Sequence, residues 1–313
     1  MDGRITAAEI SERNGLRKEI VHKSIQGMKR NGIIKGATIH INYREFGYRA
    51  VAMLLINVEP AKADQLADYV KKMQDIYTVY SNGPKGNLRV VTTLKTFQQL
   101  DEVKDAIKLL FSPSNLRTVI WTDVKEMHQN LLLSHDKETA ELEKATPDEK
   151  EEKTAETKKE KAKIDEIDHK IADILSKNGF APIDKIAKEI GISTSNAKKR
   201  YEKLKKHGLL KVTVQIDPTK LGYRALAIFY LTFTLNQDST STIEKISRIP
   251  DIISIMKTSG DYDLQVYAMI RDIDELLAIQ GEFAKIDGIA KTEMDISAIL
   301  SEWPTPRQYI STF

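Results

Sequence analysis

Apolar side chains recur with helical spacing in three successive segments of the second half of the chain. Ile164–Asn178 carries them on one face and predicts a first helix, and Pro182–Ile190 predicts a shorter second helix. Ser193 can cap a third helix that Gly208 ends, and the apolar run Leu209–Ile216 then predicts a strand. Three helices and a strand in this order predict a winged helix-turn-helix unit.

A second pattern follows, in which strands alternate with helices. Dense β-branched and apolar stretches predict the strands, and amphipathic stretches predict the helices. The second half contains Tyr223–Thr234, Ser239–Ser247, Ile252–Ser259, Leu264–Ile270, Ile273–Ile286 and Ala290–Leu300. The first half contains Tyr48–Val58, Pro60–Met73, Ile76–Asn82, Leu88–Leu94, Phe97–Phe111 and Arg117–Val124. Both series have the order βαββαβ, which predicts a ferredoxin-like sandwich with two helices on one face of an antiparallel sheet.

The order of elements occurs twice because the chain repeats itself. The stretch FGYRA at Phe46–Ala50 returns as LGYRA at Leu221–Ala225, where its glycine and tyrosine suit a turn into the first strand of each sandwich. Upstream, Gly3–Gly36 aligns with Gly179–Val212, with coincident glycines and apolar positions. The sequence therefore predicts an α+β protein, a tandem repeat of a winged helix-turn-helix plus a ferredoxin-like domain.

Six segments follow from this repeat. We expect a first winged helix-turn-helix at 1–45, a ferredoxin-like domain at 46–134, a charged linker at 135–163, a second winged helix-turn-helix at 164–220, a ferredoxin-like effector domain at 221–303 and a tail at 304–313. The first unit keeps helices at Ala7–Asn14 and Arg17–Asn31 but lacks a counterpart of the helix at Ile164–Asn178. Either its true start lies upstream or the unit is degenerate.

Composition narrows the class of protein. No apolar run reaches the roughly 18–20 residues of a membrane span, and zero cysteines exclude disulfides, thiolate zinc sites and cysteine nucleophiles. The six histidines are scattered, without a second histidine or a carboxylate at ligand spacing. We therefore expect a soluble, cytoplasmic protein with no membrane partner, no metal, no cofactor and no catalytic residues.

The distribution of charge says more about partners than the net charge of +3. The stretch Ser193–Lys211 has seven basic residues and one acid, Glu202, whereas Asp251–Glu302 leans acidic. In a helix-turn-helix, short polar side chains at the start of the last helix can reach base edges while lysines hold phosphates. A small helical bundle with a solvated lysine-rich face is the alternative interpretation.

At this point the chain resembles the Lrp/AsnC family of prokaryotic transcription regulators. The resemblance covers Ile164 to about Trp303 and rests on IDEIDHKIADILSKNG, GISTSNAKKRYEKLKKHGLL, LGYRA and the SGDYD of Ser259–Asp263, in this order and spacing. It implies a winged helix-turn-helix joined to a ferredoxin-like domain, called the RAM domain, which binds amino acids in many members and dimerises through its sheet.

The resemblance and the charge pattern together nominate site residues. The DNA-binding candidates are Thr194, Ser195, Asn196, Lys198, Lys199, Arg200 and Lys203 in the second unit, and Arg17, Lys18, His22 and Lys23 in the first. The effector-binding candidates are Ser259, Gly260, Asp261, Tyr262 and Asp263. An aspartate of this loop can receive an α-ammonium group, although glycine and aspartate also suit a plain hairpin turn.

The first copy departs from the family pattern at two places. Ser24 stands where the second copy has Arg200, and the loop at 82–87 reads NGPKGN, without an acidic residue. An effector site in the first copy is therefore doubtful, and its contact with DNA can differ.

Three functions remain open at this stage. The first is a sequence-specific regulator that binds double-stranded DNA, responds to a small molecule such as an amino acid and forms a pseudo-dimer within one chain, with further homo-oligomers left open. The second is an enzyme like the siroheme decarboxylases, which share this two-module plan but carry a histidine motif where this chain reads TVYSNGP and IMKTSGDYD. The third is a small-molecule sensor without DNA binding.

Overall fold

The computed structural model describes residues 3–73, 76–81, 87–127, 164–235, 238–299 and 302–305. The first half contains α1 (Ala7–Asn14), α2 (Lys18–Arg30), β1 (Ile34–Ile41), β2 (Ala50–Asn57), α3 (Pro60–Lys71), β3 (Ile76–Ser81), β4 (Asn87–Leu94), α4 (Phe97–Phe111) and β5 (Asn115–Glu126). The second half contains α6 (Glu166–Lys177), α7 (Ile183–Ile190), α8 (Thr194–Lys206), β6 (Leu210–Ile216), a short 3-10 helix at Pro218–Leu221, β7 (Ala225–Phe233), α9 (Ser239–Ile246), β8 (Ile252–Ser259), β9 (Leu264–Ile270), α10 (Ile273–Ala284) and β10 (Ile289–Ala298).

The helices and strands predicted from the sequence are present, and their ends move by a few residues at most. The capping residues explain several of these ends. Gly191 ends α7 in the left-handed conformation with φ of 76°, and the Ser193 hydroxyl accepts a hydrogen bond from the backbone of Asn196 to cap α8. The predicted charged linker and most of the predicted tail lie outside the described residues.

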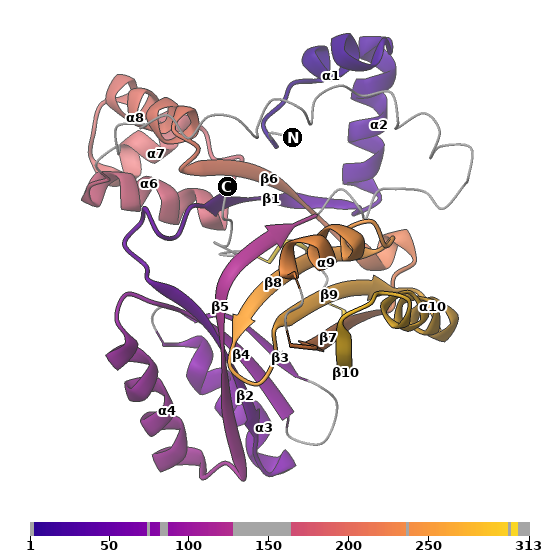
Figure 1. Cartoon of the computed structure of the whole chain (residues 1–313). Helices are drawn as coiled ribbons and strands as arrows, with labels where there is room; N and C mark the ends of the chain where they lie inside the picture. The colour runs from indigo at the N-terminus through magenta and orange to yellow at the C-terminus, as the bar shows by residue number, and fades with distance from the viewer. Residues whose placement is uncertain are drawn as a thin grey trace.

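Both halves build an antiparallel sheet with the same strand order. The order is β5-β2-β4-β3 in the first half and β10-β7-β9-β8 in the second, and β5 pairs with β8 to join them into one eight-stranded sheet. The two ends of this order, β10 and β3, also approach each other. Figure 1 shows the first-half strands with α3 and α4 on their outer side, and the second-half strands with α9 and α10.

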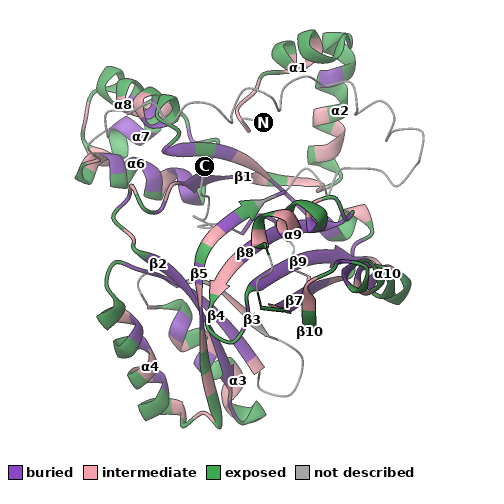
Figure 2. Cartoon of the chain, in the orientation of Figure 1, coloured by how far each residue is buried: buried purple, intermediate pink, exposed green. Residues whose placement is uncertain are grey.

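Three apolar cores hold these sheets. One lies under α3 and α4 and a second under α9 and α10. The third lies between the inner faces of the two halves and contains Trp121 and Tyr267, whose rings meet edge to face at 6.3 Å. Figure 2 shows the strands largely buried and the outer faces of α4 and α10 exposed, which is the amphipathic pattern that predicted these helices.

The strands that follow the two helical units pair with each other. β1 runs antiparallel to β6, from Ile34 opposite Ile216 to Ile41 opposite Leu210. The sequence predicted the wing strand Leu209–Ile216 of the second copy, and the structure shows that its backbone partner is β1 of the first half. Figure 1 shows α1 and α2 toward one end of this two-stranded ribbon and α6, α7 and α8 toward the other.

The two GYRA stretches connect the ribbon to the sandwiches, as predicted. Gly47 and Gly222 have φ of 86° and 90°, so only glycine fits these turns without strain. The hydroxyl of Tyr223 donates to Asp251 at 2.6 Å, and the guanidinium of Arg271 lies 4.2 Å from its ring centroid. These contacts give the second copy of the motif a structural role at its hinge.

Candidate nucleic-acid interface and effector loop

Helix α8 is held in place by one face only. Ala197, Tyr201 and Leu204 of α8 are buried. Tyr201 and Leu204 belong to a core that also includes residues of α6, α7 and the ribbon strands β1 and β6. Strand β1 belongs to the first half, but its buried residues form part of the apolar core of the second helical unit. This packing fixes which side of α8 faces solvent.

The solvent side of α8 carries most of the predicted DNA-binding residues. Thr194, Ser195, Asn196, Lys198 and Lys199 are all exposed and lie in the first two turns of the helix. No carboxylate among the described residues forms a salt bridge with either lysine of this group. The arrangement presents short polar groups and two cations at a helix N-terminus, where phosphate oxygens are favourably bound.

Arg200 occupies a different environment from its neighbours. Its guanidinium donates to Asp165 at 2.7 Å and to the fully buried Asp168 at 2.9 Å, both at the start of α6, and its Nε donates to Asn196 at 3.2 Å. The hydrogen bond from Arg200 is the largest cause that lowers the pKa of Asp165 below its usual value. In this structure Arg200 thus fixes α8 to α6, and the interpretation of Arg200 as a DNA contact remains untested.

Lys203 takes part in the same cluster. Its ammonium lies 3.4 Å from the second carboxylate oxygen of Asp168, so this candidate also contributes to the packing of α8 on α6. Sequence reasoning did not identify Asp165 and Asp168 as partners of Arg200. A usable signal was present, because IDEIDHK places Asp165 and Asp168 one helical turn apart in the segment that precedes the helix-turn-helix.

The first helical unit presents a second, unlike basic helix. Arg17, Lys18, His22 and Lys23 are exposed at the start of α2, whereas Val21 is buried beneath them. Counting from the aligned glycines, Ile20 occupies the position of Asn196, and its side chain is half exposed. The first turns of α2 and α8 therefore offer different chemistry at equivalent positions.

The segment before α1 contacts the second helical unit, which the sequence did not reveal. The guanidinium of Arg4 donates to the carbonyls of Gly179 at 2.8 Å and Ala181 at 2.7 Å, and it lies 4.9 Å from the ring centroid of Tyr201. The amide of Gly3 donates to the carbonyl of Val212 on β6. These contacts tie the two units together beyond the ribbon.

The predicted effector loop turns between β8 and β9, beside β5 of the other half. Gly260 has φ of 137°, and a Cβ placed there would lie 3.6 Å from the carbonyl oxygen of Thr118. Asp261 is exposed and its carboxylate lies 3.8 Å from the guanidinium of Arg117 on β5. The loop residues Ser259 and Asp263 are exposed as well.

Tyr262 and Asp263 have structural partners within the second half. The buried Tyr262 donates its hydroxyl to Glu293 at 2.7 Å and packs against Tyr230 with ring centroids 4.9 Å apart, and burial is the largest cause that raises its pKa. One carboxylate oxygen of Asp263 accepts the backbone amide of Phe233 at 2.7 Å. Asp261 is therefore the acidic group of the loop that faces the other half, and Arg117 and Glu293 are neighbours that sequence reasoning missed.

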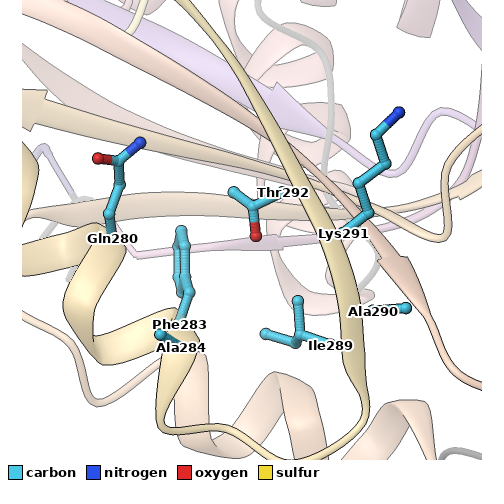
Figure 3. Close-up of a pocket in the computed structure, with 7 residues that line it drawn as sticks. All are labelled: Gln280, Phe283, Ala284, Ile289, Ala290, Lys291 and Thr292. Atoms are coloured by element: carbon cyan, nitrogen blue, oxygen red, sulfur yellow. The ribbon is translucent and has the colours of Figure 1, made fainter.

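A shallow pocket lies elsewhere on the second half. It measures about 220 Å³ and lies between the C-terminal part of α10 and the start of β10, with Gln280 and Phe283 on the helix and Ile289 to Thr292 on the strand. Figure 3 shows Phe283 on the helix and Ile289 and Thr292 on the strand, with their side chains in the space between the two elements. The residues that line this pocket do not include the predicted effector residues Ser259 to Asp263.

The described part of the chain has neither a metal-ligand cluster nor a membrane-spanning helix. No three histidine, aspartate or glutamate side chains are grouped there so that they can hold a metal ion. No helix of that part of the chain combines the length and the apolar character of a membrane span.

Comparison with known proteins places the second half in a family. The model of the AsnC-type helix-turn-helix domain matches residues 164–205, and that of the Lrp/AsnC ligand binding domain matches residues 227–301. The chain is 31% identical over 130 residues to the HTH-type transcriptional regulator FL11 of Pyrococcus furiosus, an alignment that covers 41% of this chain and 85% of the relative. It is 34% identical over 143 residues to the HTH-type transcriptional regulator LysM of Saccharolobus solfataricus, covering 45% and 97%.

Among solved structures, nearly the whole chain is similar in fold to a siroheme decarboxylase. The siroheme decarboxylase NirDL superposes with a TM-score of 0.59 over 97% of this chain and 88% of that one, at 16% identity, which is a likeness of fold alone. The regulatory protein AsnC of Haemophilus influenzae is 31% identical over 136 residues, covering 43% of this chain and 91% of its own length. With these matched domains and relatives, the chain belongs to the Lrp/AsnC family of helix-turn-helix transcription regulators.

Proposed function

We propose that the chain is a sequence-specific DNA-binding regulator made of two Lrp/AsnC-type copies fused end to end, and that a small molecule such as an amino acid modulates it. The shared strand order of the two halves supports the fusion. The pairing of β1 with β6 and of β5 with β8 supports a pseudo-dimer within one chain, because both contacts join the two copies.

The observation that carries this proposal is the solvent face of α8. Its first two turns combine exposed Thr194, Ser195 and Asn196 with the exposed ammonium groups of Lys198 and Lys199. A helix with this pattern suits the major groove, where amides and hydroxyls read base edges and lysines contact phosphates. The clamp between Arg200 and the aspartates of α6 supports this role by fixing the direction of the helix.

The two basic helices carry different side chains, so the two half-sites of the DNA that they contact are expected to differ in sequence. A dimer of identical units binds a palindrome, since its two reading helices are identical. Here α2 offers Lys18, Glu19 and Ile20 where α8 offers Thr194, Ser195 and Asn196. We therefore propose an operator with two unlike half-sites.

The effector loop is the proposed site of modulation. Asp261 can receive an ammonium group and Arg117, 3.8 Å away on the other half, can receive a carboxylate, so an amino acid would contact both halves at once. Binding at this seam would bias how the halves sit against each other, and with them the two helical units. Ser259 and Gly260 contribute the turn that brings Asp261 to β5.

The test is selection of binding sites from random DNA, followed by affinity measurements over a range of salt concentration. We expect one enriched site and an affinity that falls steeply with salt, because each neutralised phosphate releases a counterion. Replacing Lys198 and Lys199 by alanine should weaken binding to all sequences, whereas Asn196→Ala should relax selectivity at one base pair by about 1–3 kcal/mol. Lys72 and Lys245, both exposed on the sandwich domains, provide the matched double-alanine control.

The outcomes separate the regulator from the sensor. No enriched site and no salt dependence would contradict DNA binding. If amino acids still bound under those conditions, and Asp261→Asn abolished that binding, the chain would be a sensor that works without DNA.

A second candidate function is catalysis on a tetrapyrrole, which the whole-chain fold likeness to a siroheme decarboxylase favours. Absorbance titration with siroheme, followed by analysis for decarboxylated product, tests it. Saturable binding with turnover would replace the regulator as the leading function.

A further inference from the structure

The inner faces of the two halves meet through a buried ion pair that has no symmetry-related copy. The guanidinium of Arg89 on β4 donates to Asp295 on β10, through Nε at 3.1 Å and Nη2 at 2.5 Å. The arginine side chain is only 7% exposed and the aspartate 28%. The hydroxyl of Tyr230 donates to the same carboxylate oxygen at 3.0 Å.

A second polar contact crosses the same interface. The indole N–H of Trp121 on β5 donates to the side-chain oxygen of Gln265 on β9 at 2.8 Å, and both residues are buried. At the rim, Arg117 lies 3.8 Å from Asp261. In these two ion pairs the first half contributes the cation and the second half the carboxylate.

Strand register identifies which residues are equivalent in the two halves. Arg89 lies opposite Leu55, the sixth residue of β2, and Gln265 lies opposite Tyr230, the sixth residue of β7. Arg89 and Gln265 are therefore equivalent. By the same count Arg117 corresponds to Glu293, Val119 to Asp295 and Trp121 to Ser297.

The equivalent residues do not reproduce these contacts. Exchanging the halves turns the pair of Arg89 and Asp295 into a pair of Gln265 and Val119, because these are the equivalent residues. Neither Gln265 nor Val119 carries a charge. Identical subunits related by a two-fold axis must use one self-complementary surface, so every contact occurs twice. This interface instead requires two unlike surfaces.

Pairing of two first halves would be unfavourable. Each buried Arg89 would face Val119 instead of a carboxylate, and each Trp121 N–H would face a guanidinium, which is also a donor. A buried charge that loses its partner is strongly destabilising.

Pairing of two second halves would be unfavourable for related reasons. Asp295 would face an amide instead of a guanidinium, and Ser297 would stand where Trp121 fills the core, which leaves a void. Glu293, which pairs with Lys291 on its own strand, would also approach Asp261 of the other copy. Attraction in the right pair and repulsion in both wrong pairs are the two components of specificity.

We propose that Arg89, Trp121, Gln265 and Asp295 make each half selective for the other, so that like halves do not pair and the chain does not form mixed dimers with regulators that pair with copies of themselves. The partner that the first-half sheet accepts carries a carboxylate at the position of Asp295 and a hydroxyl at that of Tyr230. This proposal does not depend on DNA or effector binding.

The experiment cuts the folded full-length chain and lets the halves exchange. A protease site inserted between residues 135 and 163 is cleaved after folding, and isotope-labelled and unlabelled cut chains are mixed in mild urea until native mass spectrometry detects labelled halves paired with unlabelled ones. We expect the unlike pair to exceed either like pair by about tenfold or more, as the loss of a buried charge partner requires. A statistical mixture of like and unlike pairs would overturn the proposal.

A double substitution tests the assigned residues. Arg89→Gln together with Asp295→Val gives each half the residue that the other half has at the equivalent position. The fraction of like pairs should then rise, most of all for pairs of first halves, because Ser297 still leaves a void between two second halves. The exposed pair of Lys177 and Asp173, replaced by glutamine and asparagine, is the matched control and should leave the distribution unchanged. An unchanged distribution in the Arg89 and Asp295 variant would place the selectivity elsewhere and overturn the assignment.

If that variant does not fold, the pair can be tested in the uncut chain by exchanging the charges of Arg89 and Asp295. Arg89→Asp and Asp295→Arg should each lower the melting temperature, and the combination should recover part of the loss, because the pair is restored in reverse. Strictly additive losses would contradict a specific pair. None of these readouts involves DNA, so failure here leaves the proposed function to its own test.

Discussion

At the scale of single residues, Arg200 shows how one side chain can support a binding surface without facing it. Its guanidinium joins α8 to Asp165 and to the buried Asp168 at the start of α6. The first half has Ser24 at this position and, within its described residues, no helix equivalent to α6. In the second unit, the arginine and its two carboxylates thus form one cluster that holds α8 against α6.

This cluster predicts a pH-dependent contribution to stability. The pKa of Asp165 is lowered in the folded protein, chiefly by the hydrogen bond from Arg200. A lowered pKa means that the stabilisation is complete above the unfolded value near about 4 and is lost as the pH falls through the folded value. Asp165 is about half exposed, so solvent screens its pairing with Arg200, and Arg200→Ala should cost about 1 kcal/mol at pH 7 and less as the pH falls below about 4.

Urea unfolding followed by far-UV circular dichroism at pH 7, 5 and 3 measures this difference. Lys199→Ala, one residue away and exposed, is the control and should leave stability unchanged while weakening DNA binding. A cost for Arg200→Ala that stays constant down to pH 3 would contradict the role given to the carboxylates.

At the scale of elements, the close approach of α6 to β1 joins the second helical unit to the first half. Gly179, just after α6, donates its amide to the carbonyl of Ala37 at 2.6 Å. A Cβ at Gly179 would lie 2.8 Å from backbone atoms of Ala37 and Thr38. Only glycine allows the turn to approach the strand this closely.

We predict that Gly179→Ala destabilises the protein by about 1–3 kcal/mol, because the added methyl group would push α6 away from β1. Gly281→Ala in α10 is the matched control, since no atom lies within 4 Å of its added Cβ, and it should be neutral or stabilising by up to about 1 kcal/mol. Hydrogen exchange of the β1 amides locates the effect. Equal behaviour of the two variants would show that the approach is not close in solution.

At the scale of the whole molecule, one ribbon carries two unlike basic helices. The β1–β6 ribbon fixes α2 and α8 relative to each other, and the contacts of Arg4 reinforce that arrangement. If both helices contact DNA, the protein has a defined direction on its operator. A homodimer has no such direction.

Hydroxyl-radical footprinting on the selected operator tests this direction. Replacing Lys198 and Lys199 by alanine should reduce protection at one end of the site, and replacing Lys18 and Lys23 should reduce it at the other, because each pair lies on a different helix. Identical changes along the whole site from both variants would contradict two separate reading helices.

Much of the fold could be predicted because its signals are local. Apolar spacing identified the helices, dense β-branched runs identified the strands, and the repeat of GYRA set the two halves in register. Ser193 and Gly191 act as the predicted helix start and stop. The exposure of Thr194, Asn196 and Lys198 also followed from helical spacing, since Ala197, Tyr201 and Leu204 mark the opposite side.

Other features could not be predicted because they depend on which elements meet. Arg117 and Asp261 lie on different halves, and their approach requires the pairing of β5 with β8. The same holds for Arg4 and Gly179, which are 175 positions apart. Pairing between distant strands has no sequence period, so nothing local indicates it.

The sequence by itself determined the order of elements and the chemistry on the solvent face of α8, because each follows from neighbouring residues. Only the tertiary structure decided that Arg200 is held by Asp165 and Asp168, that the wing strands pair with each other, and that Arg89 is buried against Asp295. The physical reason is that charges and strand edges are satisfied by whatever partner the packing of distant segments brings close.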